Sequence, residues 1–176
     1  MDTNPNLCNT VLIDWIPEIP IKVICFVWSA AMERIPITIG LSKRGVKLVD
    51  VNCGQCSNIE ETVSHIFFKC PYAKTVWECI IRWCKIKLPH CESLEDILKF
   101  TRSWGHCPKK RKILVSICYG TIWWLWKARC EIFFKEIKIP PTKTADNIQG
   151  MVFILLKHRS SNYPIKWVDW NIYPFC

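Results

Sequence analysis

The sequence lacks every motif that marks a common catalytic centre. It has no glycine-rich phosphate loop, no Gly-x-Ser-x-Gly and no His-Glu-x-x-His. It also has no Tyr-x-Asp-Asp polymerase motif, and its acidic residues are sparse and form no pattern typical of metal catalysis. A Cys–His nucleophile pair remains open as an alternative, but these absences together predict that the chain is not an enzyme.

The sequence also lacks a hydrophobic run long enough to cross a bilayer. Its two main apolar stretches, 21–32 and 113–126, have twelve and fourteen residues, whereas a transmembrane helix needs about 20. We therefore expect both to form buried core helices, and we expect no membrane partner. The N-terminal residues have neither the basic nor the apolar region of a signal peptide, which predicts an intracellular protein of the nucleus or cytoplasm rather than a secreted one.

The composition is that of a folded protein with a substantial core. Half of the 176 residues are hydrophobic and ten are Trp, which excludes intrinsic disorder. The twelve cysteines could indicate a disulfide scaffold, but a chain this long and this rich in core residues does not need one. Several lie in apolar stretches, where free cysteine behaves as a small hydrophobic residue: Cys25, Cys79, Cys84, Cys118 and Cys130. A reducing compartment fits this distribution.

Four potential metal ligands lie within eighteen residues, in the pattern Cys53-x2-Cys56-x8-His65-x4-Cys70. Three thiolates and one imidazole are the ligand set of a closed tetrahedral zinc site, in which no position stays open for a substrate. Chance is the alternative in a cysteine-rich chain, but the added histidine and its surroundings argue against it. The spacing therefore predicts a structural Zn²⁺ ion as the cofactor.

The residues between the ligands indicate how each one is presented. Gly54 eases the bend of a turn in which the first two sulfur atoms converge. Asn58 and Glu61 have the spacing of a capping box. They predict a helix from 58 to about 68 that carries His65.

The last ligand, Cys70, precedes a proline, which is favoured at the first position of a helix. We expect that helix to run from 71 to about 86, with Cys70 as its N-cap. The helix dipole and the unpaired backbone N–H groups there lower the pKa of a thiol and stabilise a thiolate. This is a separate physical reason for Cys70 to be a ligand.

The remaining pattern is mainly helical and contains no internal repeat. Thr38 is expected to cap a short helix that Gly45 ends, the segment 46–52 is expected to be extended, and Ser93 begins another helix. These two helices cover 39–44 and 93–104, and further helices are predicted over 21–34, 109–138 and 144–159. The aromatic tail, 167–176, is expected to fold back onto the core. The fold class predicted is therefore a small helical module stapled by zinc, followed by a helical C-terminal extension.

The chain is basic, with 24 Lys and Arg against 15 Asp and Glu and a formal charge of +9. Such a charge favours a polyanionic partner, RNA or DNA first, although it also fits simple solubility. Two clusters are candidate phosphate contacts. They consist of Lys43, Arg44 and Lys47, just before the metal ligands, and of Lys109, Lys110, Arg111 and Lys112. Each cluster taken alone could instead be a solvated helix end.

Two weaker patterns leave alternatives open. The aromatic cluster Trp123, Trp124 and Trp126 could stack on nucleic-acid bases or belong to the core. The pairs His90-Cys91 and His106-Cys107 could form a second metal site or be loop residues.

Several fixed positions together are similar to a known family. They are Pro20-x-Lys22-x3-Phe26-x-Trp28, Arg34-x-Pro36-x-Thr38-x2-Leu41-x2-Arg44-Gly45, Cys53-x2-Cys56-x4-Glu61-Thr62-x2-His65-x-Phe67-Phe68-x-Cys70-Pro71 and Val76-Trp77. This set resembles the zinc-binding domain that follows the reverse transcriptase in plant non-LTR retrotransposons. The resemblance covers about 15–85. It implies that Cys53, Cys56, His65 and Cys70 are the metal ligands.

The resemblance also implies an origin in a longer element-encoded protein, whose polymerase, endonuclease and RNase H segments are absent from these residues. We expect a zinc-binding domain over 15–86 and a helical extension over 87–176. One functional hypothesis is a module that helps a reverse transcriptase grip RNA or DNA. The alternative is a structural module that docks onto a polymerase domain or a host protein, which predicts exposed Trp or Leu patches.

Overall fold

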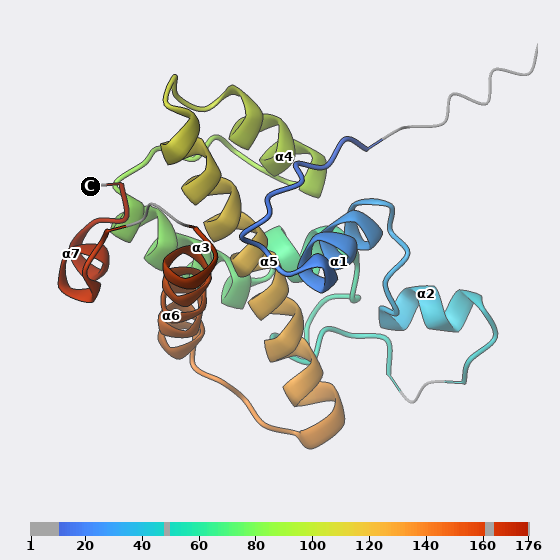
Figure 1. The fold of residues 1–176 in the computed structure, drawn as a ribbon. Helices are drawn as coiled ribbons and strands as arrows, with labels where there is room; N and C mark the ends of the chain where they lie inside the picture. The colour runs from blue at the N-terminus through green and yellow to red at the C-terminus, as the bar shows by residue number, and fades with distance from the viewer. Residues whose placement is uncertain (1–10, 48–49, 161–163, 176) are drawn as a thin grey trace, which may run out of the picture.

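The computed structural model describes residues 11–47, 50–160 and 164–175, and these residues are mainly α-helical, as predicted (Figure 1). They contain no strand, only one isolated antiparallel bridge between Asn52 and Glu60. The helices, in chain order, are α1 (Ile21–Ala31), α2 (Thr38–Lys43), the π-helix η1 (His65–Lys69), α3 (Pro71–Cys84), α4 (Leu94–Ser103), α5 (Pro108–Lys135), α6 (Pro141–Arg159) and α7 (Trp167–Ile172).

The long helix α5 forms the centre of the molecule, with α1, α3, α4 and α6 packed around it (Figure 1). Every residue from 113 to 122 is buried, because a helix that is apolar on all sides is stable only when other elements cover all of them. This confirms the core helix predicted for the second apolar stretch. None of the described helices is long and apolar enough to cross a membrane.

The first apolar stretch, in α1, is buried on one side only, so the expectation of a fully buried helix is wrong there. Val23, Val27 and Ala30 face the core. Ile21 and Trp28 are exposed, although both are large and apolar. The hydrophobic run is continuous in sequence, but the described part of the chain provides packing partners for only one face of this helix.

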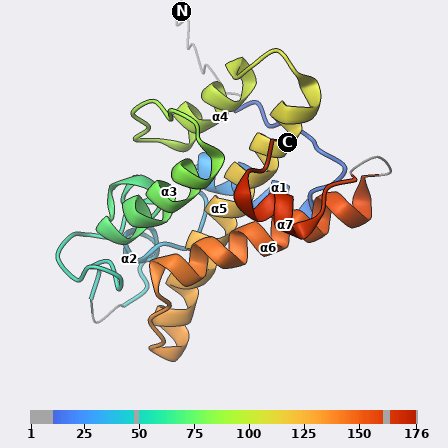
Figure 2. The ribbon, with the colours of Figure 1, turned by 90° about the vertical axis from the view of Figure 1, so that its left-hand side faces the viewer.

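The C-terminal residues return to the core, as expected, and form the short helix α7 beside α6 (Figure 2). The Trp170 side chain is fully buried. Its Nε1 donates to the Gln149 carbonyl at 3.0 Å, and its own carbonyl accepts from Trp83 Nε1 at 2.9 Å. Helix α3 packs on both α5 and α6, so one hydrophobic core includes residues from both sides of position 86. The division into two domains at that position stays a prediction.

The helix ends follow the predicted signals in part. Ser93 and Asp96 form the capping box that begins α4, and Gly45, with φ of +84°, stands where the chain leaves α2. Thr38, however, does not cap α2. Its hydroxyl donates to the Val51 carbonyl at 2.8 Å, so it joins α2 to the segment that precedes the metal ligands.

Candidate metal centre

The structure brings the four predicted ligands together from three separate segments. One ligand atom from each of Cys53, Cys56, His65 and Cys70 lies within 4.8 Å of the other three. The Sγ atoms of Cys53 and Cys70 are 3.9 Å apart, and Cys56 Sγ is 3.3 Å from His65 Nε2. Ligand atoms about 2.0–2.3 Å from a tetrahedral zinc ion lie roughly 3.5–3.8 Å from one another. The donor set and its geometry therefore fit a zinc ion that all four residues would hold.

A tight turn presents the first two ligands. The Ser57 N–H donates to the Cys53 carbonyl at 2.7 Å, and the Cys53 N–H donates to the Ile59 carbonyl at 2.8 Å. The left-handed residue of this turn is Ser57, with φ of +60°, rather than Gly54. A Cβ on Gly54 would lie 2.8 Å from Ile132 Cγ2 of α5. Gly54 is therefore needed because the turn approaches α5 closely, not because of the bend.

The helix that carries His65 begins later than the capping box predicts. Asn58 and Glu61 lie in irregular structure, and helical residues begin at Val63. The actual cap is Thr62, whose hydroxyl accepts from the His65 N–H at 3.1 Å. The capping-box prediction is wrong for two reasons. Asn52 and Glu60 form an antiparallel bridge, so the backbone there is not helical. The Glu61 carboxylate accepts from Arg129 and is therefore not available to cap the helix.

A π-helical turn brings the last two ligands onto one side. The Cys70 N–H donates to the His65 carbonyl at 2.8 Å, which closes a turn between residues five apart. In an α-helix, residues three or four apart share a face, so the x4 spacing between these ligands requires the wider turn. π-turns of this kind often occur at functional sites. Cys70 then has extended backbone and forms the N-cap of α3, as predicted.

The contact between the Cys53 and Cys70 thiols shifts the pKa of both groups. The hydrogen bond with the Cys70 thiol lowers the pKa of Cys53 to about 5, against the opposing effect of burial. The same hydrogen bond and burial raise the pKa of Cys70, while the backbone N–H groups of Tyr72 and Ala73 at the start of α3 act in the opposite direction. A bound zinc ion would hold both sulfur atoms as thiolates, since metal binding requires deprotonated cysteine ligands.

The structure adds one feature that the sequence patterns do not reveal, a buried ion pair beside the metal centre. The Glu61 carboxylate accepts from Arg129 Nη2 at 2.7 Å and from Arg129 Nε at 3.0 Å. Glu61 Oε1 also accepts from the Thr38 N–H at 2.9 Å. Both charged side chains are almost fully buried. A single carboxylate thus joins α2, the metal-binding segment and α5. No local pattern marks this pair, because Arg129 follows the apolar stretch 113–126 among other charged residues, and its partner is 68 positions away.

The two basic clusters are exposed but lie far apart. Lys43, Arg44 and Lys47 lie at the end of α2 and just beyond it, before the metal ligands in the chain. Lys109–Lys112 form the first turn of α5, and Lys112 Nζ is 3.7 Å from a Glu18 carboxylate oxygen. The rise of an α-helix separates Lys112 from Arg129, which lies beside the metal centre, by about 25 Å. The structure therefore does not unite them into one patch (Figure 1).

The weaker patterns do not form sites. Among the described residues, only Cys53, Cys56, His65 and Cys70 form a cluster of three or more potential metal ligands, so neither His–Cys pair contributes a second centre. The tryptophans at 123, 124 and 126 are half-buried against the core.

The fold and the ligand geometry thus define a mainly helical protein with a closed tetrahedral metal centre. Residues 2–77 match the family model described as zinc-binding in reverse transcriptase. This part of the chain is therefore a zinc-binding domain of the reverse-transcriptase type, as the resemblance implied, and its cofactor is zinc. No curated protein and no solved structure matched the chain.

Proposed function

We propose that the chain is a non-catalytic module of a non-LTR retrotransposon protein, of the type found in plants, that helps an associated reverse transcriptase hold RNA or DNA. The closed ligand set supports a structural role for zinc, since all four positions belong to the protein. The proposal places the protein inside the cell, in the nucleus or cytoplasm. Its polymerase partner would be a reverse transcriptase domain.

The observation that carries the proposal is the link between the metal centre and the basic segment. Glu61 lies between the ligands Cys56 and His65 in sequence and accepts from the Thr38 N–H at the start of α2. Lys43, Arg44 and Lys47 lie at the other end of α2 and just beyond it. This contact supports a zinc-bound loop that would hold the start of α2, and with it the three exposed cations. None of the described residues neutralises these cations through an ion pair.

The test measures the affinity of the zinc-loaded protein for a labelled single-stranded RNA of about 20 nucleotides by fluorescence anisotropy. Each phosphate contact to a single strand contributes about −0.7 to the slope of log K against log salt. The triple variant Lys43→Gln/Arg44→Gln/Lys47→Gln should bind more weakly and lose about 2 from that slope. Chelation of zinc should weaken binding by the wild-type protein in the same direction.

A charge-matched control uses three exposed lysines elsewhere, in the variant Lys74→Gln/Lys143→Gln/Lys166→Gln. It has the same net charge as the first variant, so a general loss of attraction affects both equally. Equal slopes for the two variants, or binding that does not depend on salt, would refute the proposal. A further variant, Lys109→Gln/Lys110→Gln/Arg111→Gln, measures the contribution of the second cluster to the same salt slope.

A further inference from the structure

Helix α1 exposes an apolar face that no described residue covers. Ile21, Cys25 and Trp28 have i, i+4, i+7 spacing and therefore lie along one side of the helix. Ile21 is 67% exposed and Trp28 is 43% exposed. Leu12 and Trp15, from the segment before the helix, are 63% and 66% exposed. These five residues are called the α1 surface below, and contiguous apolar surface of this kind marks interaction sites.

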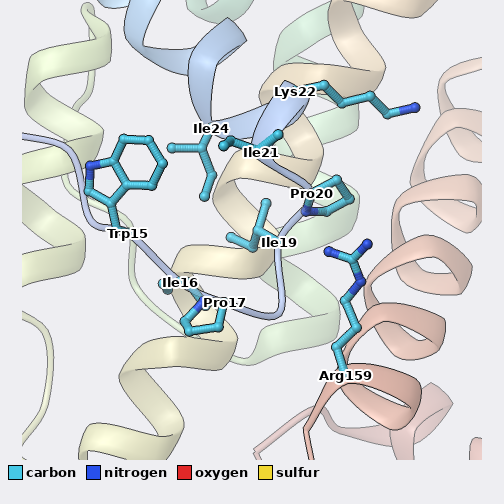
Figure 3. Close-up of a pocket in the computed structure, with 9 residues that line it drawn as sticks. All are labelled: Trp15, Ile16, Pro17, Ile19, Pro20, Ile21, Lys22, Ile24 and Arg159. Atoms are coloured by element: carbon cyan, nitrogen blue, oxygen red, sulfur yellow. The ribbon is translucent and has the colours of Figure 1, made fainter.

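The α1 surface is hollowed rather than flat. One cavity of about 520 Å³ is lined by Trp15, Ile19, Ile21 and their neighbours (Figure 3). A second cavity, of about 330 Å³, is lined by Leu12, Cys25, Trp28 and others. Trp15 and Ile24 line both cavities, so the two are neighbouring hollows. Cavities of this size accept bulky side chains.

The larger cavity has an apolar end and a cationic end. In Figure 3 the Trp15 ring stands on one side, and the Lys22 ammonium and the Arg159 guanidinium lie on the other. Among the described residues, no acidic side chain lines this cavity, and neither cation forms an ion pair. Glu18, which is close in sequence, is buried and lies 3.7 Å from Lys112. The cavity therefore suits a group that joins an apolar body to a carboxylate.

We propose that the α1 surface is a docking site for a protein segment that carries bulky apolar side chains and at least one neighbouring Asp or Glu. The apolar side chains fill the two hollows, and the carboxylate pairs with Arg159 and Lys22. This interaction is separate from nucleic-acid binding, because it uses none of the residues at positions 43–47. A docking site of this kind also fits the second hypothesis from the sequence, a structural module that docks onto a polymerase domain or a host protein.

Two other occupants fit the chemistry less well. A second copy of the chain would pack the same surface against itself and would bring the cations Lys22 and Arg159 of both copies together. A nucleic acid would place polar base edges against a lining that is mostly isoleucine and proline, which offers few hydrogen-bond partners.

The test is selection from a phage-displayed library of random peptides of about 12 residues on the zinc-loaded full chain. The enriched peptides should combine aromatic or aliphatic residues with Asp or Glu. In anisotropy measurements their affinity should fall at least tenfold with Ile21→Glu and with Arg159→Glu. The matched control is Val168→Glu on α7, where the side chain is also 67% exposed, and it should leave the affinity unchanged.

Zinc content and circular dichroism show whether each variant is folded, and substitutions at exposed positions are expected to leave both unchanged. A library without enriched peptides, enrichment without acidic residues, or equal binding to all variants would overturn the docking site. So would a loss of RNA binding by Ile21→Glu, which would assign the surface to nucleic acid, or self-association that Ile21→Glu abolishes. None of these results depends on the outcome of the RNA test with the triple variant.

Discussion

The zinc loop, residues 51–70, and the helical core formed by α3, α5 and α6 are stabilised by different interactions. The core is held by apolar burial along long helices, where Leu114, Ile117 and Ile122 are fully enclosed. The zinc loop has one turn, one isolated bridge and a five-residue π-helix, which is too little regular structure to be stable by itself. Ligands and a few specific contacts to α5 must therefore hold the loop in place.

This difference predicts that metal loss affects one region more than the other. Cys70→Ser should reduce the zinc content from one ion per chain to near zero by elemental analysis, because it removes a ligand of a four-coordinate site. Residues 51–70 should lose their protection from hydrogen exchange, while α5 and α6 keep theirs. Cys25→Ser, at an exposed cysteine outside the site, should change neither. Full zinc content in Cys70→Ser would remove this residue from the centre.

The second prediction concerns the ion pair that joins the two regions. Arg129→Ala leaves the Glu61 carboxylate buried without its cation, which should lower the free energy of unfolding by about 3–5 kcal/mol. Urea denaturation measures this change. The double variant Glu61→Gln/Arg129→Ala should lose less than the sum of the two single variants. Arg82→Ala, at an exposed arginine, should stay within about 0.5 kcal/mol of wild type, and a similar result for Arg129→Ala would show that the pair does not join the regions.

The third prediction concerns the closest contact between the loop and the core. In Gly54→Ala the new Cβ would meet Ile132 Cγ2 at 2.8 Å, so the variant should be less stable by about 1–3 kcal/mol. Adding Ile132→Ala removes the clashing methyl group and should recover part of the loss. Gly150→Ala, where a Cβ has open space, is the control and should be neutral or stabilising. Equal thermal denaturation midpoints for the two glycine variants would contradict the close packing.

The smallest effect is expected at the start of the π-helix. Thr62→Ala removes the hydroxyl that accepts from the His65 N–H and should cost about 1 kcal/mol. Asn58→Ala should cost almost nothing, because Asn58 does not cap this helix in the structure. Chemical denaturation of both variants distinguishes the two caps. A larger loss of stability in Asn58→Ala than in Thr62→Ala would instead support the capping box that the sequence suggests.

The regions also differ in how far the sequence predicted them. The core helices were predicted in the right order, and capping residues such as Ser93 marked one start closely because they act locally. Some ends were misplaced: α5 ends at Lys135 rather than at 138, and α6 begins at Pro141 rather than at 144. In the zinc loop the four predicted ligands do lie together, but the helix between them was misplaced. Asn58 and Glu61 have the spacing of a cap, yet Glu61 gains more by pairing with Arg129 in the buried interior. Local patterns contain no information about a partner 68 positions away.

The sequence by itself determined the metal chemistry, the helical class and the basic charge, because ligand type, hydrophobic periodicity and composition are properties of the chain alone. Only the tertiary structure decided that a π-turn aligns His65 with Cys70 and that Glu61 joins three segments. It also decided that one side of an apolar helix remains exposed beside Lys22 and Arg159. Each of these depends on which distant residues meet, and burial sets the cost of leaving a charge or an apolar face without a partner.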